Sequence, residues 1–174
     1  RQRQMCIRDS LLCKHMDWQS EEIRKKLSLA CMLHDLAHQN AQKAQLETLN
    51  MAKLQTLDKE DQKGILDHSE KMAKMLEENP NMPQEVVNLV RNHHEGLGKN
   101  RSYPKGLTGV HLNQLDCVFI VAHSFVVELY KVAFNPNKLS LCYDDIASNY
   151  TSGHFKTVLK AFEKLAKEDL KIKS

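Results

Sequence analysis

The stretch Asn113–Val132, NQLDCVFIVAHSFVVELYKV, says most about the fold. It contains no Gly or Pro and predicts a long apolar helix. Its longest apolar run, Leu115–Val127, is interrupted by Asp116, His123 and Ser124, so it is too short and too polar to cross a bilayer. We therefore expect a helix of a globular domain and no membrane span.

The segments around this helix also have helical patterns. Ser20 can cap a helix whose first turn is acidic, and apolar residues then recur at helical spacing as far as His34. A second helix is expected at Gln62–Glu78, with Ile65, His68, Met72 and Met75 on one face. Pro83 is placed to open a third, which runs into Asn92-His93-His94-Glu95. A Gly-rich loop at 96–109, a turn at Asn135-Pro136-Asn137 and a last helix at Phe155–Leu170 complete an all-α class.

Composition narrows the class of protein further. The chain has 174 residues, 41% hydrophobic and 27% charged, with a formal net charge of +3. These values fit one globular domain and exclude whole-chain disorder. Basic residues are interleaved with acidic ones, so no nucleic-acid partner is expected. The five cysteines form no CxxC pair, which is typical of a reduced, cytoplasmic protein, and Cys31 and Cys117 read as core residues.

Two segments differ from this pattern, the segment at 39–58 and the start of the chain. The segment Gln39–Asp58 is polar and helix-prone, without Gly or Pro. Residues 1–10, RQRQMCIRDS, have no amphipathic period and do not begin with Met. We interpret residues 1–10 as foreign or disordered and residues 11–174 as the domain, with one or more N-terminal helices missing.

Histidine is the unusual residue, with nine in the chain. Four expected helices each bring imidazole or carboxylate groups onto or near an inward face, at His34-Asp35, His68, His93-His94 and His123. A lone His on an apolar face is usually a core residue, but such residues on four helices favour a functional site. Nitrogen and oxygen ligands suit Mn, Fe, Ni or Zn. No comparable cluster includes the other histidines singled out here, His15, His111 and His154. We assign them to the surface or to packing.

The order of these motifs resembles an HD-GYP domain, a subgroup of the HD metal-phosphohydrolase superfamily linked to cyclic di-GMP hydrolysis. The matching motifs are Leu33-His34-Asp35, His68, His93-His94-Glu95, Tyr103–Leu107 and Val121–His123, and the resemblance extends over about residues 16–166. It implies an HD-domain-like helical bundle with a metal centre between helices. It also implies two divalent ions, held by His34, Asp35, His68, His93, His94 and His123, with Asp35 as the bridge.

Three positions depart from the family pattern. His123 stands where the family has Asp, which lowers the negative charge of the site. His38 replaces a Lys expected to meet a substrate phosphate, and we assign it with Asp35 to catalysis. The family's DGxGYP stretch is rewritten as GKNRSYP. In this loop Lys99, Arg101, Tyr103 and Lys105 are candidate substrate-binding residues, although loop cations are often only solvated. Asn92 and Glu95 are candidates for orienting the imidazoles, and Glu95 reads equally well as an exposed helix-end acid.

The resemblance implies a bacterial signalling enzyme that hydrolyses cyclic di-GMP by attack of metal-activated hydroxide on phosphorus. A first alternative is a degenerate domain that binds a nucleotide or a protein partner without turnover. A second is an HD phosphohydrolase with a different nucleotide substrate. An upstream receiver or sensor domain and signalling proteins are the partners that the family implies, and the oligomeric state stays open between monomer and homodimer.

Overall fold

The computed structural model describes residues 12–18, 20–37, 54–98 and 101–171. Its helices, in chain order, are α2 (Glu21–Leu33), α5 (Lys59–Glu77), α6 (Gln84–Asn92), α7 (Gln114–Lys131), the short 3-10 helix η1 (Pro136–Lys138), α8 (Leu139–Asn149) and α9 (Phe155–Glu168). Within these residues the β-structure is limited to isolated bridges from Gly96 and Leu97 to Thr108. The predicted all-α class is confirmed.

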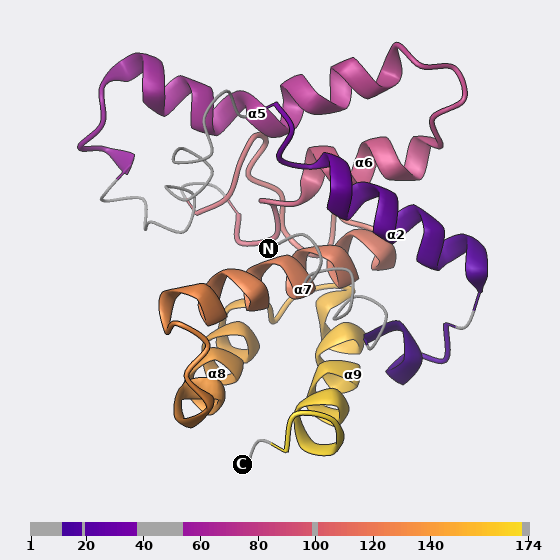
Figure 1. Ribbon diagram of the computed structural model, residues 1–174, viewed down its shortest axis with the longest axis vertical. Coiled ribbons are helices and arrows are strands. Elements are labelled where there is room, and N and C mark those ends of the chain that lie inside the picture. Colours follow the sequence, from indigo (N-terminus) through magenta and orange to yellow (C-terminus); the bar gives the residue numbers. More distant parts are fainter. Residues whose placement is uncertain (1–11, 19, 38–53, 99–100, 172–174) are drawn as a thin grey trace.

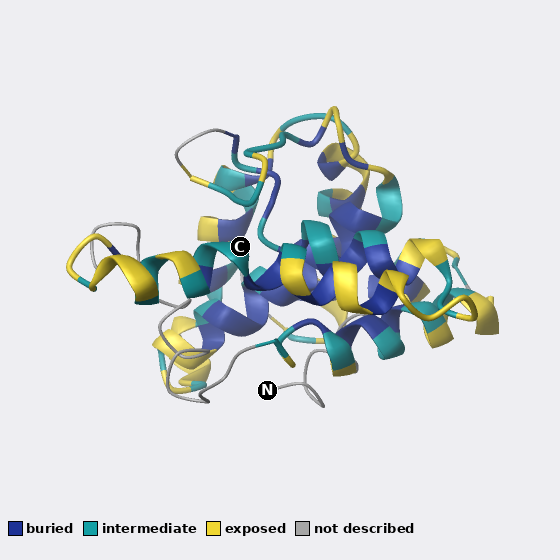
Figure 2. Ribbon diagram, turned by 90° about the horizontal axis from the view of Figure 1, so that it is seen from above, coloured by how far each residue is buried: buried dark blue, intermediate teal, exposed yellow. Residues whose placement is uncertain are grey.

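Helix α7 forms the centre of the molecule. It crosses the middle in Figure 1, with α2, α5 and α6 on one side and α8 and α9 on the other. It packs against α6, α8 and α9, and the buried residues gather along this axis in Figure 2. Phe119 and Phe125 on α7 are almost fully buried, and a side chain of this size stabilises the fold by about 1.5–3 kcal/mol when buried. The segment read first in the sequence is therefore the core helix.

A reciprocal cap fixes the start of α7. The Asn113 side chain accepts a hydrogen bond from the Asp116 backbone N–H, and the Asp116 carboxylate accepts one from the Asn113 N–H. Such a capping box satisfies two of the backbone donors that a helix end leaves open. The helix is one residue shorter at each end than predicted, since Asn113 and Val132 are its two cap residues.

The other predicted helices are present with small shifts at their ends. Helix α5 begins at Lys59, because the Asp58 side chain caps it by accepting from the Asp61 N–H. Pro83 is the N-cap of α6 rather than its first residue, and Ser20 is the N-cap of α2 without a side-chain cap bond. Met75 does not share the buried face of Ile65, His68 and Met72, contrary to the prediction, since it is 59% exposed. The buried stripe of α5 runs through Leu76 instead.

Helix α8 was not expected from the sequence. The turn predicted at Asn135–Asn137 is present as η1, but the chain then continues directly into Leu139–Asn149. Only Cys142 and Ile146 of α8 are buried, so its apolar stripe is too sparse to stand out. This helix later proves important because it forms one wall of the pocket beside the histidines.

No helix in the described part of the chain is long and apolar enough to cross a membrane. Cys31 and Cys117 are buried, as predicted, and burial raises the pKa of Cys117 to about 12. The predictions for residues 1–10, for His38 and Lys99, and for most of Gln39–Asp58 fall outside the described residues.

Candidate metal centre

Three histidines owe their orientation to the helices that carry them. In each, the ring Nδ1 lies within hydrogen-bond distance of the backbone carbonyl three residues earlier. These bonds join His34 to Cys31 (2.9 Å), His68 to Ile65 (2.6 Å) and His93 to Val90 (2.6 Å). A carbonyl oxygen can only accept, so each Nδ1 carries the proton and donates it. In the neutral ring, the lone pair is then at Nε2, on the opposite side from the helix backbone.

The rings of five histidines converge, with His93 at the centre. The ring centroid of His93 lies 4.0 Å from that of His94, 5.0 Å from His34, 5.1 Å from His68 and 5.2 Å from His123. The Nε2 atoms of His68 and His93 are 3.1 Å apart. Helices α2, α5, α6 and α7 thus bring together all five of the histidines that the sequence singled out as metal ligands.

Asp35 adds the one predicted carboxylate. Its oxygens lie 2.9 Å from Nε2 of His34 and 3.9 Å from Nε2 of His93, and its side chain is 12% exposed. It therefore lies at the edge of the imidazole cluster, where a carboxylate can contribute negative charge.

The imidazole cluster is suited to binding a metal ion. Burial, together with the neighbouring rings of His94, His34, His68 and His123, lowers the pKa of His93 well below its usual value. Nε2 of His93 then holds a lone pair that faces Nε2 of His68. Ligands bonded to one metal ion at about 2.0–2.1 Å stand about 3 Å apart, which matches this separation. Two groups of side chains could hold an ion: His34, His93 and His123, and His68, His93 and His94.

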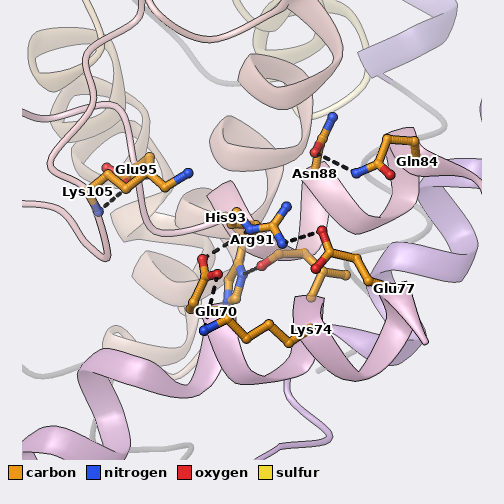
Figure 3. A network of polar contacts seen from close by, with 10 residues as sticks. Glu70, Lys74, Glu77, Gln84, Asn88, Arg91, His93, Glu95 and Lys105 are labelled. Carbon is orange, nitrogen blue, oxygen red and sulfur yellow. Dashed lines mark hydrogen bonds and ion pairs between the residues drawn. The ribbon is translucent and has the colours of Figure 1, made fainter.

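A network of ion pairs joins the two helices that carry His68 and His93. Arg91 of α6 donates from Nε to Glu70 (3.0 Å) and from a terminal nitrogen to Glu77 (2.7 Å), both on α5. Figure 3 shows Arg91 between these two carboxylates, close to His93. Since Glu70 is two residues after His68 and Arg91 two before His93, the network fixes the spacing of the two imidazoles.

The histidine cluster opens into a pocket of about 400 Å³. His93, His94 and His123 line it from the cluster, and Arg101 and Tyr103 line it from the loop. Tyr103 stacks on His94, with ring centroids 4.5 Å apart. The structure thus places two of the predicted substrate-binding residues beside the cluster. Lys105 does not line this pocket, and what the structure gives for it is a backbone N–H bonded to Glu95.

Glu95 is buried and holds the loop, and its expected role of orienting the imidazoles stays a prediction. It is 1% exposed, so the expectation of an exposed helix-end acid is wrong. Its two carboxylate oxygens accept the backbone N–H groups of Lys105 (Figure 3) and Leu107, each at 2.6 Å, and these bonds tie the loop down. Glu95 therefore shapes the pocket wall by holding the loop.

Asn92 lies next to Asp116, at the start of α7. Burial raises the pKa of Asp116 to about 6, against the opposing effect of hydrogen bonds from the Asn113 backbone and the Asn92 side chain. Asn92 thus connects the end of α6, which carries His93, to the capping box of the core helix.

Several pocket residues were missed from the sequence because α8 was missed. Asp145, Asn149 and Tyr150 reach the pocket from α8 and its C-cap, and Ser124 and Lys131 from α7. Asn149 accepts a hydrogen bond from Arg101 (2.6 Å), and the Ser124 and Tyr150 hydroxyls are 2.7 Å apart. The i, i+4 pair Cys142 and Ile146 was the available signal for this helix.

The remaining histidines lie outside the cluster. His15 pairs with Asp169, whereas His111 and His154 are exposed, with His111 beside Thr108. Their assignment to packing or to the surface is confirmed.

Fold and site together define an all-helical protein with a buried centre of imidazoles opening onto a polar pocket. The family model of the HD domain matches residues 7–130, more than half of the chain, so the chain belongs to the HD domain family. Its members are generally metal-dependent phosphohydrolases. Searches of curated proteins and of solved structures gave no match.

Proposed function

We propose that this protein is a metal-dependent phosphodiesterase whose substrate is cyclic di-GMP. The observation that carries the proposal is the continuity of the two features of the site, since His93, His94 and His123 belong both to the imidazole cluster and to the wall of the 400 Å³ pocket. A phosphodiester in the pocket would reach the ions held by the cluster. The HD family membership supports the reaction class, and the HD-GYP resemblance of the sequence supports the substrate.

The residues have distinct parts in this proposal. His34, His68, His93, His94 and His123, with Asp35, hold two divalent ions of the Mn, Fe, Ni or Zn class. Bound ions of this kind lower the pKa of water and offset the charge that builds up on phosphorus. Asp35 and His38 remain the candidates for catalysis.

Arg101 and Lys131 line the pocket and supply positive charge for the substrate phosphates. Arg101 donates a hydrogen bond to Asn149, and the partly exposed Lys131 pairs with Glu128. Tyr103 holds the ring of His94 by stacking on it. The proposed setting is a cytoplasmic signalling protein with a receiver or sensor domain upstream.

The first test is the metal content of the full chain after anaerobic reconstitution with Mn or Fe, followed by an assay of cyclic di-GMP hydrolysis. We expect bound metal and turnover in the wild type and loss of both in Asp35→Ala. Asp144→Ala is the matched control, because Asp144 is an exposed carboxylate that does not line the pocket. A chain without bound metal would contradict the proposal.

A second candidate is a domain that binds a nucleotide without turnover. It is favoured by the ring of His123, which lies 5.1–5.3 Å from the rings of His34 and His94, where the family pattern has a carboxylate. His123→Asp separates the two functions. If the wild type binds cyclic di-GMP without cleaving it and the variant cleaves it, the chain is a binding module. Cleavage of other nucleotides in place of cyclic di-GMP would indicate a phosphohydrolase of different specificity.

A further inference from the structure

The pocket extends well beyond the histidine cluster, along one face of α7. His123, Val127 and Lys131 line it at intervals of four residues, so they follow one another on that face. At a rise of about 1.5 Å per residue, the helix between His123 and Lys131 spans about 12 Å. This is roughly the length of a nucleotide, so a phosphate at the cluster would place its base near the outer end of the pocket.

Helix α8 forms another wall of the pocket, with its C-terminal end nearer the cluster. It packs beside the second half of α7 in Figure 1, and the hydroxyl of Tyr150, at its C-cap, lies 2.7 Å from that of Ser124. Ser124 directly follows His123, so Tyr150 marks the inner part of this wall. Asn149 and Asp145, one helical turn apart, then line the pocket toward its outer part.

The hydrogen bond between Arg101 and Asn149 fixes which way the amide of Asn149 faces. A guanidinium group can only donate, so the atom that lies 2.6 Å from the terminal nitrogen of Arg101 is the amide oxygen. The NH₂ group of Asn149 is therefore turned away from Arg101. It remains as a hydrogen-bond donor in the pocket wall.

Asp145 supplies acceptors on the same wall. Among the described residues its carboxylate makes no hydrogen bond or ion pair, whereas the other carboxylate that lines the pocket, on Glu128, pairs with Lys131. Asp145 is also exposed, so a ligand can reach it. Burial raises the pKa of Tyr150 to about 12, and of the nearby charges Asp145 raises this pKa and Arg101 lowers it. Both charges therefore lie close to the Tyr150 hydroxyl.

We propose that Asp145 and Asn149 read the Watson–Crick edge of a guanine base and so set the base specificity of the pocket. Guanine presents two donors, N1–H and the N2 amino group, beside one acceptor, O6. The carboxylate of Asp145 matches the two donors, and the NH₂ group of Asn149 matches O6. Val127 and Ile146 line the pocket as apolar contacts for the ring.

The same pair of side chains rejects adenine. Adenine has an acceptor at N1, which would face the negative carboxylate of Asp145, and an amino group where guanine has O6. A site built to hydrogen-bond one pattern leaves polar groups unpaired when the other pattern enters, so discrimination is strong. This inference rests on the proposed function, because it takes the phosphate of the nucleotide to lie at the histidine cluster.

The test is the affinity of the full, metal-loaded chain for GMP, IMP and AMP, measured by titration calorimetry. These nucleotides share ribose and phosphate and contain no phosphodiester to be cleaved, and IMP lacks only the N2 amino group of GMP. We expect GMP to bind at least about tenfold more tightly than AMP, with IMP between them.

Two variants separate the donor from the acceptor. Asp145→Asn should weaken GMP binding about tenfold and leave AMP binding within about twofold of the wild type. Asn149→Asp keeps an acceptor for Arg101 but removes the donor to O6, so it should also weaken GMP binding selectively. Asp144→Asn is the matched control, because Asp144 is exposed and does not line the pocket.

The outcomes distinguish this inference from the proposed function. Equal affinity for GMP and AMP, binding of neither, or an equal loss for both in Asp145→Asn would overturn the inference and leave metal-dependent hydrolysis standing. Selective binding of GMP by a chain that does not cleave cyclic di-GMP would support the inference and overturn the proposed hydrolysis.

Discussion

The histidine cluster and the pocket beside it are held in place in different ways. In the cluster, His34, His68 and His93 are each oriented by a carbonyl three residues earlier on the same helix. In the pocket wall the contacts join residues far apart in the chain, as in Arg101 to Asn149 and Ser124 to Tyr150. The orientation of these imidazoles therefore depends on local helix geometry, and the arrangement of the pocket wall depends on tertiary packing. Changes to the wall should therefore spare metal binding.

The largest effect is expected where the loop meets the start of α9. A Cβ on Gly153, whose φ is +56°, would lie 2.1 Å from the Gly109 carbonyl oxygen. Backbone must move to relieve this contact, so Gly153→Ala should lower the free energy of unfolding by roughly 4 kcal/mol in a urea titration. Gly64→Ala in α5 is the control. Nothing lies within 4 Å of its Cβ, and it should stabilise the protein by about 0.5–1 kcal/mol. If Gly153→Ala and Gly64→Ala changed the free energy of unfolding equally, the close contact with Gly109 would not be the cause.

The second prediction concerns Asp116, at the start of α7, and the pH dependence of the free energy of unfolding. Its pKa is raised from 3.8 to about 6 in the folded protein, so the folded state binds this proton more tightly than the unfolded state. The stabilisation is complete below about pH 4 and is lost as pH rises through 6. The difference of about two pKa units corresponds to about 3 kcal/mol.

Asp116→Asn should therefore flatten the fall in stability between pH 4 and 7, measured as the urea midpoint of variant minus wild type. Asp144→Asn, at an exposed site, should follow the wild type. A parallel pH dependence in Asp116→Asn would show that this carboxyl is not the group responsible.

Glu95→Gln tests whether the loop can be loosened without disturbing the cluster. The substitution removes the charge from two hydrogen bonds and leaves only one strong acceptor for the N–H groups of Lys105 and Leu107. We expect a loss of about 2 kcal/mol in stability and faster proteolysis within 96–109, with unchanged metal content. Loss of metal in this variant would show that Glu95 supports the imidazoles, as the sequence first suggested.

The smallest effect is expected for Tyr150→Phe. It removes the bond between the Tyr150 and Ser124 hydroxyls and should cost about 1 kcal/mol. Burial raises the pKa of Tyr150 to about 12, so the wild-type ring should show no phenolate absorbance below about pH 11. An earlier ultraviolet titration of this tyrosine would mean that the pocket wall is more open than the structure indicates.

Most helices could be predicted from the sequence because long segments with a helical pattern of apolar residues are recognisable without the tertiary structure. The core helix at Asn113–Val132 follows from its long apolar composition, and α2 follows from the helical spacing that begins after Ser20. Helix α8 could not be read in this way, since it buries only Cys142 and Ile146. Met75 was misplaced because the buried stripe of α5 passes through its neighbour Leu76.

The sequence by itself determined the residues that gather in the histidine cluster. Each of those histidines lies on or at the end of a predicted helix, and a helix fixes the direction of a side chain relative to its own backbone. Only the tertiary structure decided how the site is divided and enclosed. Contacts between distant elements, which no local pattern encodes, decide three features of the site. They are the sharing of His93, the burial of Glu95 beneath the loop, and the placing of Lys131, Asn149 and Tyr150 around the pocket.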